Sequence, residues 1–352
     1  MRQLLFCDAA GGDGMVGQKE ALLFFTWLHI YLSFFELSCY DIQNIRGSVR
    51  ILYSAFLDSA EKFCPELKIL TNEALSRHTS FRIGGPASVM VFPSSVEEVS
   101  VCLRLLSQMG EKPVLLGAGT NILAPDEGLS RVILCLKDRF SQIRRADACT
   151  LEAQAGASLA ALAVFAQNAG LTGLEFAHGI PGTVGGGVYM NAGAYGGEMK
   201  QVVTSVTVMD YDGSVRTLSA EEAAFGYRTS AFETMDAVIV GASFALQPGD
   251  PAAIRHTMTA LMERRRASQP LELPSAGSTF KRPVGGYAAA LIDEAGLKGL
   301  RVGGAAVSEK HAGFVVNLGG ATAADVHALI GEVQQSVEEK SGILLQPEVR
   351  IW

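Results

Sequence analysis

Residues 173–197 read GLEFAHGIPGTVGGGVYMNAGAYGG, and nine of these 25 residues are glycine. Glu175 is the only carboxylate in the stretch, and apolar residues such as Ile180 and Met190 are spread through it. A flexible linker would be rich in serine and glycine without these apolar residues. Glycine at this density indicates a backbone that adopts positive φ or lies against something that leaves no room for a Cβ atom.

A second glycine-rich segment, Leu116–Asn121 (LGAGTN), follows a predicted strand. A loop of this kind at a strand end exposes successive backbone N–H groups, which can cradle a diphosphate. It lacks the third glycine of a dinucleotide fingerprint, because Ile122 stands there, and it lacks the lysine of a P-loop. We interpret the two segments as walls of a site for a large, flat, phosphate-bearing cofactor. Two tight turns in an ordinary α+β core are the alternative.

The composition indicates a globular chain, because 48% of the 352 residues are hydrophobic and only 18% are charged. The length suits two or three domains. The net charge of −7 and the lack of a long basic run argue against nucleic acid as the main partner. The cysteines form no Cys-x-x-Cys pair, so we expect buried thiols in a reducing compartment and no metal site. They are Cys7, Cys39, Cys64, Cys102, Cys135 and Cys149.

The segment from Ala21 to Cys39 is nearly all apolar, with Glu36 as its only formal charge. Its length is close to the minimum for a membrane span. However, few Lys and Arg residues flank it, and no clear signal-peptide cleavage site follows it. We expect residues 1–50 to be an upstream extension outside the folded region, and we expect no membrane association unless this segment is a true anchor.

Capping boxes at Ser95–Glu98 and Thr322–Asp325, caps at Ser158 and Asp250, and apolar spacing predict the helices, and runs of β-branched residues predict the strands. The predicted helices lie within 51–75, where Pro65 stops the helix, and over 96–110, 158–170, 250–266, 288–295 and 322–337. The predicted strands are His78–Pro86, which runs into a turn, Ala87–Phe92, Pro113–Leu116, Val132–Leu136, Val202–Met209, Val215–Leu218, Ala237–Ala245, Ala312–Leu318 and Leu345–Ile351. The β-α-β order near the start is typical of an α/β layer, and Asp212-Gly213 is a strong hairpin signal.

Three later segments carry side chains suited to chemistry. Arg228, beside Tyr227 in the sequence AFGYRTS, could fork onto a carboxylate, although pairing with a surface glutamate is the commoner outcome. Ser278, before a basic pair in PSAGSTFKRP, suits proton transfer or phosphate binding, but capping of a turn is equally consistent with these residues. Glu348 lies either on an exposed strand face or in a cleft, where desolvation would raise its pKa.

Taken together, these motifs resemble one family closely, the UDP-N-acetylenolpyruvoylglucosamine reductases (MurB), over roughly Leu75–Trp352. The matching motifs, in the order of the family, are TSFRIGG (79–85), LGAGTN (116–121), GIPGTVGG (179–186), NAGAYG (191–196), GYRTS (226–230), AGSTFK (276–281) and PEVR (347–350). The chain resembles the shorter form of the family, because Phe244–Asp250 leads directly into the next helix without an inserted tyrosine-bearing loop.

The resemblance implies an α+β protein that binds FAD non-covalently in the fold of the vanillyl-alcohol-oxidase (PCMH) type. The FAD-binding region would be 51–248, in two subdomains split near residue 115, and 249–352 would be an α+β domain for the UDP-sugar. NADPH would reduce the flavin. Hydride would then pass to C3 of the enolpyruvyl ether of UDP-N-acetylglucosamine, and a proton to C2, giving UDP-N-acetylmuramate for peptidoglycan synthesis in the cytoplasm.

Position by position, the resemblance implies that Ser278 donates the proton and that Arg228 and Glu348 polarise the substrate carboxylate. Tyr227 would line the substrate site, and Lys281 would be the cation beside the serine. The implied cofactor-binding residues are Arg82, Gly84, Gly117, Ala118, Gly119, Thr120, Asn121, Gly179, Ile180, Pro181, Gly182, Thr183, Gly185, Gly186, Asn191 and Gly193.

The chain departs from the family pattern at two places, and two other functions are alternatives to the one that the resemblance implies. Without the tyrosine loop, the lid over the substrate must be built differently, and the lysine usual before the serine motif is replaced near Gln269. One alternative is a flavin-dependent alcohol oxidase of the same fold, against which Arg228, Ser278 and Glu348 argue. The other is a flavin- or nucleotide-binding protein without turnover, which would require a true anchor at 21–39. The sequence does not predict the oligomeric state.

Overall fold

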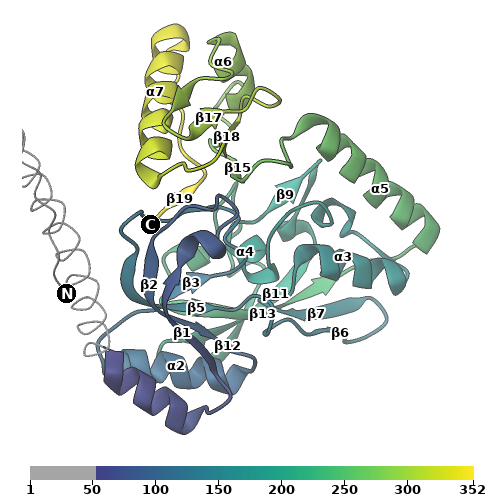
Figure 1. Ribbon diagram of the computed structural model, residues 1–352. Helices are drawn as coiled ribbons and strands as arrows, with labels where there is room; N and C mark the ends of the chain where they lie inside the picture. The colour runs from purple at the N-terminus through teal and green to yellow at the C-terminus, as the bar shows by residue number, and fades with distance from the viewer. Residues whose placement is uncertain (1–52) are drawn as a thin grey trace, which may run out of the picture. The chain divides into compact units, whose positions relative to one another are not determined.

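The computed structural model describes residues 53–352, and residues 55–352 form one compact unit (Figure 1). The predicted extension 1–50, including the apolar segment 21–39, lies outside the described residues. Within residues 53–352, no helix combines the length and the apolar composition needed to cross a bilayer.

The first sheet contains the predicted β-α-β unit. Its strand order is β1-β2-β5-β3, in which β2, β5 and β3 run parallel and β1 is an antiparallel edge strand. In that order the strands cover Lys68–Ala74, Pro86–Phe92, Leu129–Cys135 and Val114–Leu116. Every residue of β2 after Pro86 is buried, as is typical of a parallel strand inside a sheet. Helix α2 (Val96–Gln108) connects β2 to β3.

Two expectations near the start of this region need correction. The helix predicted within 51–75 covers 53–63, and the residues after Pro65 form the edge strand β1, which has little alternation to reveal it. The strand predicted at His78–Pro86 is wrong. A 3-10 turn, η1 (Leu75–Arg77), leads instead into tight turns, because Arg82 and Gly84 have φ values of 57° and 126°, which no extended strand accommodates.

The N-terminus of α2 is capped as predicted on one side only. The Ser95 hydroxyl accepts the backbone N–H of Glu98 at 3.2 Å. The Glu98 carboxylate does not return to Ser95. It accepts the backbone N–H of Ser94 at 2.6 Å, one residue earlier than in a standard capping box.

The second sheet is antiparallel and has the strand order β12-β11-β13-β7-β6. In that order the strands cover Val215–Ser219, Val203–Asp210, Ala237–Ala245, Thr150–Gln154 and Ile143–Arg145. The hairpin between β11 and β12 turns at Asp212-Gly213 as predicted, with Gly213 at φ 89°. Strands β6 and β7 were not predicted, because polar residues such as Arg144 and Glu152 interrupt the apolar pattern.

The glycine-rich stretch and the residues that flank it form a chain of short elements instead of one long element. They are β8 (Leu171–Thr172), η2 (Glu175–Ala177), α4 (Val184–Tyr189), β9 (Gly193–Ala194), β10 (Gly197–Glu198) and η3 (Met199–Gln201). Thr183 caps α4, which lies against β13 and β7. Helix α3 (Leu159–Asn168), capped by Ser158 as predicted, precedes the stretch.

Helix α5 (Pro251–Ser268) begins at the predicted Asp250 cap, whose carboxylate accepts the N–H groups of Ala252 and Ala253. It follows η4 (Ala231–Glu233) and the short strand β14 (Gln247–Pro248). The apolar spacing of Ile254, Met258, Leu261 and Met262 predicts a buried stripe, but only Ile254 and Met258 are buried. The helix contacts α3 and η2, and Figure 1 shows it beside α3 and away from α6 and α7. The domain boundary near Pro248 stays a prediction.

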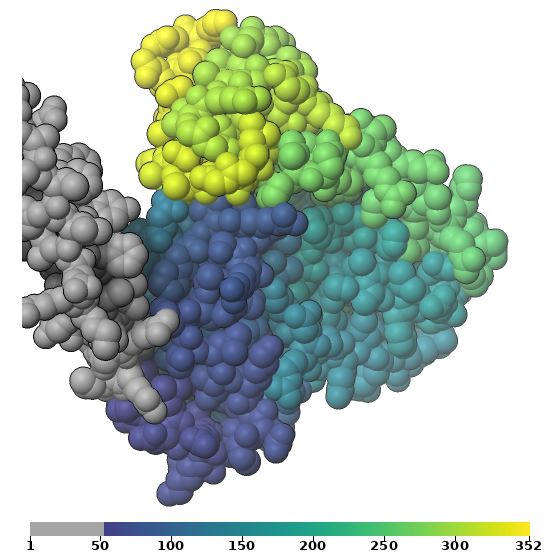
Figure 2. Space-filling model, viewed as in Figure 1, coloured from purple at the N-terminus to yellow at the C-terminus, as the bar shows by residue number. Residues whose placement is uncertain are grey.

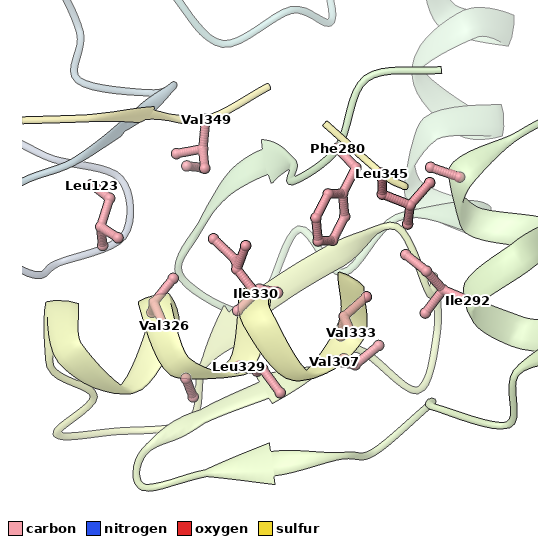
Figure 3. Close-up of a cluster of buried hydrophobic side chains, with 14 of the residues drawn as sticks. Leu123, Phe280, Ile292, Val307, Val326, Leu329, Ile330, Val333, Leu345 and Val349 are labelled. Atoms are coloured by element: carbon pink, nitrogen blue, oxygen red, sulfur yellow. The ribbon is translucent and has the colours of Figure 1, made fainter. Parts of the chain in front are cut away.

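The C-terminal part has its own sheet and core. The sheet order is β15-β18-β17-β16, which cover Ser275–Ser278, Phe314–Asn317, Ala305–Val307 and Arg301–Val302. Helices α6 (Ala288–Glu294) and α7 (Ala323–Ser341) accompany it, and α7 starts at the predicted Thr322–Asp325 capping box. Figure 3 shows Val326, Leu329, Ile330 and Val333 of α7 directed into one apolar cluster with Phe280.

The last residues of the chain return to the first part of the fold. Only Arg350–Ile351 form a strand, β19, which pairs in parallel with β4 (Ile122–Leu123). The predicted strand Leu345–Ile351 is therefore too long, because Pro347 has no N–H to donate. The preceding residues bond instead to the segment after β15, where the Lys281 N–H donates to the Gln346 carbonyl at 2.8 Å.

Several hydrogen bonds join the C-terminal part to the loops of the first sheet. Asn317 donates to the Phe81 carbonyl at 3.0 Å. The Asp126 carboxylate accepts the first two N–H groups of α7, from Ala323 at 2.7 Å and Ala324 at 3.1 Å. In Figure 2 the C-terminal residues, in yellow and yellow-green, lie directly on residues in blue and teal. The surface between these parts is therefore closed by specific polar contacts.

We predict that Asp126→Ala destabilises the protein by about 1 kcal/mol, the usual effect of losing a helix cap. The free energy of unfolding in urea measures this effect. Glu127→Ala is the matched control, because this neighbouring carboxylate has no hydrogen-bond or ion-pair partner within residues 53–352 and should leave stability unchanged. Equal stability of the two variants would contradict the capping role of Asp126.

Candidate active site

A cavity of about 870 Å³ lies among the first sheet, the glycine-rich stretch and the C-terminal segment. Its lining includes the loop 117–121 after β3, residues 180–183 and 185–187, and Arg228, Ser278 and Glu348. These residues come from five separate parts of the sequence. The volume is in the upper part of the range for small-molecule and cofactor sites.

The loop 117–121 reaches the cavity because two of its residues lack side chains. Gly119 has a φ of 66°, and a Cβ atom there would lie 2.1 Å from the His78 carbonyl oxygen. A Cβ atom on Gly117 would lie 2.5 Å from the Thr183 hydroxyl oxygen. Both values are well below any normal contact distance. The loop therefore packs against the turn before it and against the cap of α4 only as glycine.

The two glycine-rich segments are joined directly. The Thr120 hydroxyl donates to the Pro181 carbonyl at 2.8 Å. Close packing behind them also requires glycine, since a Cβ atom on Gly185 would lie 2.9 Å from the Ala155 Cβ. The result is a continuous backbone wall with few bulky or charged side chains, which suits a large ligand that carries phosphate groups.

Most of the predicted cofactor residues line this cavity. They are Gly117, Ala118, Gly119, Thr120, Asn121, Ile180, Pro181, Gly182, Thr183, Gly185, Gly186 and Gly193. Arg82, Gly84, Gly179 and Asn191 are not part of its lining. Gly84 is needed for packing, since a Cβ atom there would lie 2.7 Å from the Ala124 Cβ.

Asn191 is fully buried, and its amide is bonded to protein groups. It donates to the Gly226 carbonyl at 2.8 Å and to Glu198 at 2.9 Å, and it accepts the N–H of Lys200 at 2.9 Å. These bonds support the turn that ends at Arg228. The cofactor-binding role assigned to Asn191 from the sequence stays a prediction.

Arg228 and Glu348 form an ion pair at the cavity. The Arg228 Nε donates to Glu348 Oε1 at 2.8 Å, and Nη2 donates to the Gly193 carbonyl at 3.2 Å. Only 23% of the Arg228 side chain and 14% of the Glu348 side chain is exposed. The backbone of Arg228 is in the left-handed region, with φ 55°. A non-glycine residue there is strained, and such strain is common at functional sites.

Burial raises the pKa of Glu348, and nearby cations oppose this effect. Arg228 has the largest opposing influence, followed by Lys281 and Arg350. Protonation of Glu348 is therefore easier than that of an exposed glutamate, and a protonated carboxyl can donate a hydrogen bond. Arg228 holds the other side of the group in a fixed orientation.

Ser278 ends strand β15 and faces the cavity. It is exposed, and within residues 53–352 its hydroxyl has no hydrogen-bond partner, so the hydroxyl is free to donate to a ligand. Lys281 does not line the cavity, but its charge acts on Glu348. Tyr227 also lies outside the lining. Its hydroxyl accepts the N–H of Arg282 at 3.1 Å, and its ring faces the guanidinium of Arg228.

The sequence analysis missed several charged and polar residues at the cavity. Arg350 forms an ion pair with Glu233 and lies over the Tyr189 ring. Arg265 also lines the cavity, and burial lowers its pKa. From the sequence, its place in the last turn of α5 indicates only a cation that complements the helix dipole. Arg265 has no acidic partner within residues 53–352, and the nearby Gln269 has a buried oxygen without a hydrogen-bond donor.

Known proteins match this chain over both of its parts. A model of the UDP-N-acetylenolpyruvoylglucosamine reductase C-terminal domain matches residues 269–352, and a model of an FAD binding domain matches residues 87–219. The UDP-N-acetylenolpyruvoylglucosamine reductase of Lactococcus lactis subsp. cremoris is 46% identical over 82% of this chain and 95% of its own length. The chain belongs to the UDP-N-acetylenolpyruvoylglucosamine reductase family.

Other members of the reductase family are similar to this chain in sequence and in structure. UDP-N-acetylenolpyruvoylglucosamine reductase 2 of Symbiobacterium thermophilum is 47% identical over 81% of this chain and 92% of its own length. The crystal structure of the Thermus caldophilus reductase (MurB) is similar with a TM-score of 0.69 and 34% identity, over 82% of this chain and 99% of that one. The predicted fold, a PCMH-type FAD-binding fold followed by an α+β C-terminal domain, is confirmed.

We predict that Glu348 makes the stability of the flavin-free reductase depend on pH. Its folded-state pKa is raised, so the neutral form is favoured in the folded protein, and stability falls as pH rises through that pKa. Glu348→Gln has no titrating carboxyl at this position and should not show this loss. Any stability advantage of the wild type over the variant should therefore shrink or reverse from acidic to neutral pH. Urea unfolding at several pH values measures it.

Glu127→Gln is the control for this experiment, because Glu127 is exposed and lies outside the cavity. It should follow the wild type at every pH. A difference in stability between wild type and Glu348→Gln that does not vary with pH would contradict the prediction, because it would show that the pKa of Glu348 is the same in the folded and unfolded states.

Proposed function

We propose that this chain catalyses the FAD-dependent, NADPH-linked reduction of the enolpyruvyl ether of UDP-N-acetylglucosamine to UDP-N-acetylmuramate, a step of peptidoglycan precursor synthesis. The observation that carries the mechanism is the Arg228–Glu348 pair, which lies with Ser278 at one cavity bounded by a glycine-rich backbone wall. The cytoplasmic location belongs to the same proposal, because NADPH and a nucleotide-linked sugar are the expected substrates.

The residues present fit FAD. Loop 117–121 offers backbone N–H groups at the cavity, residues 180–183 and 185–186 line it from another side, and Gly117, Gly119 and Gly185 stand where a Cβ atom would clash with neighbouring atoms. These loops would hold the diphosphate and the flat rings. When bound and reduced by NADPH, FAD supplies the hydride that adds to C3 of the enolpyruvyl group.

Arg228 binds and orients the carboxylate of the enolpyruvyl group. Its Nε is engaged by Glu348 and one N–H of Nη2 by the Gly193 carbonyl, so the two N–H groups of Nη1 and the second one of Nη2 are available to a ligand. Negative charge increases on this carboxylate as the hydride arrives. A fixed guanidinium in a site with little water stabilises that charge more than a mobile cation in solvent would.

Glu348 acts on the same developing charge in its protonated form. A neutral carboxyl donates a hydrogen bond, whereas an ionised one would repel the enolate. Burial raises the pKa of Glu348 in the direction that this role needs. Arg228 keeps the carboxyl in place whichever form is present.

Ser278 donates the proton to C2, which completes the reduction of the double bond. A serine hydroxyl is a weak acid, so it can act only beside a strongly basic carbon whose charge has just formed. Its alkoxide needs nearby positive charge, and Lys281, three residues along the chain, provides it. Arg265, a buried cation without an acidic partner in the described part of the chain, is available to bind a phosphate group.

The experiment that tests the function is direct. The purified protein should show a flavin spectrum, and its NADPH oxidation should depend on the enolpyruvyl UDP-sugar. A yellow protein that oxidises NADPH equally well with and without this substrate would overturn the proposal and favour another flavin-dependent activity.

Ser278→Ala should leave reduction of the flavin by NADPH intact and slow the second half-reaction by roughly 10²- to 10⁴-fold, the usual effect of losing a proton donor. Single-turnover kinetics of each half-reaction measure the two rates. Ser275→Ala, in the same strand but outside the cavity lining, is the matched control and should retain both rates. Equal losses in both half-reactions of Ser278→Ala would contradict the assigned role.

Arg228→Lys should slow the second half-reaction by roughly 10²- to 10³-fold, because lysine keeps the charge but loses the fork that stabilises a developing anion. Arg216→Lys is a close control. Arg216 Nε also lies 2.8 Å from a carboxylate oxygen, that of Asp210, but this pair is on an exposed strand outside the cavity. If both variants behave alike, the fork of Arg228 is not needed for catalysis.

A further inference from the structure

Glu348 is held through its backbone as well as its side chain. Its N–H donates to the Thr279 carbonyl at 2.7 Å, directly after Ser278. Its carbonyl accepts the side-chain amide of Asn121 at 3.2 Å. Three segments that are far apart in the sequence therefore meet at this one residue, namely the cavity loop 117–121, the end of β15 and the C-terminal segment.

The backbone carbonyl of Asn121 also binds the chain just after Glu348. The Arg350 N–H donates to the Asn121 carbonyl at 2.9 Å, where the two-residue ladder between β19 and β4 begins. The Trp352 N–H donates to the Leu123 carbonyl at 3.1 Å. Leu123 and Val349 are buried in the same apolar cluster, and Figure 3 shows them close to Val326 of α7. The end of the chain is thus anchored beside the cavity loop.

Thr120, the neighbouring residue of the loop, bonds to a different segment. The Thr120 hydroxyl donates to the Pro181 carbonyl, so this side chain joins the loop to the opposite backbone wall. Within residues 53–352, Asn121 has the only side chain of the loop that is hydrogen-bonded to the Glu348 segment. The loop therefore makes one side-chain contact with the cofactor wall and another with the segment that carries Glu348.

We propose that Asn121 is a positioning residue that fixes the Glu348 carboxyl relative to the cavity loop, so that occupation of the loop by the cofactor also orders the C-terminal segment. The inference rests on the proposed function for its kinetic consequence. An asparagine suits this role because its side-chain amide donates to the Glu348 carbonyl, whereas the bond from the Arg350 N–H goes to the backbone carbonyl and can form with any residue at this position. An aspartate of the same shape would place negative charge against the Glu348 carbonyl.

The kinetic test compares Asn121→Ala and Asn121→Asp with wild type in each half-reaction across pH. The second half-reaction should fall by roughly 10- to 100-fold, the effect of a small misplacement of a reacting group. Its pH profile should also shift, because the position of Glu348 relative to Arg228, Lys281 and Arg350, the charged groups that act on it, would change. Reduction of the flavin by NADPH should fall by a smaller factor, because the role proposed for Glu348 belongs to the second half-reaction.

Thr120→Val is the matched control, because it removes a side-chain hydrogen bond from the same loop without touching the Glu348 segment. It should weaken flavin binding and leave the pH profile of the second half-reaction unchanged. If the Asn121 variants instead weaken flavin binding and leave that profile unchanged, Asn121 contacts only the cofactor and the inference is wrong.

A second readout does not depend on turnover. Hydrogen exchange of residues 348–352 should be faster in flavin-free Asn121→Ala than in flavin-free wild type, and added FAD should slow it in the wild type but much less in the variant. Exchange that is unaffected by the substitution would overturn the inference. A wild-type protein that fails to reduce the enolpyruvyl UDP-sugar would defeat the proposed function, whereas the exchange result would still test the Asn121 contact.

Discussion

The ion pair between Arg228 and Glu348 joins residues that are 120 positions apart, and the arrangement of the active site depends on it. Each partner is placed by a different part of the fold. Arg228 stands on a strained turn that the buried Asn191 supports through the Gly226 carbonyl. Glu348 is placed by the β19–β4 ladder and by the segment after Ser278. The pair can form only when both parts of the molecule are folded and docked together.

The glycine-rich stretches have a separate role, which is to let backbone approach backbone. At Gly119 and Gly117 a methyl group would overlap with atoms of the adjacent turn and of Thr183. The wall that results carries little charge of its own, so the charged groups at the cavity come from other segments. In the proposed mechanism, the most distinctive sequence of the protein is therefore separate from the residues that act on the substrate.

Local signals were enough for most of the helices. Ser158, Asp250 and Thr322 cap the helices that they were expected to cap, because a capping side chain bonds within three residues of itself. Strands were less predictable. β1 gains its structure from pairing with β2, and the terminal strand is shortened because Pro347 cannot donate and the neighbouring groups bond to Thr279 and Lys281. Such partners are invisible in a local window.

The sequence by itself determined the family and the cofactor of this protein, because residue types in a fixed order carry that information. Its motifs also select Arg228, Ser278 and Glu348 as the residues for which we propose catalytic roles. Only the tertiary structure decided how these side chains meet, that Asn121 holds the Glu348 segment, and that Arg350 and Arg265 lie at the same cavity. The physical reason is that hydrogen bonds, burial and pKa shifts depend on neighbours in space, and here those neighbours lie more than a hundred residues apart.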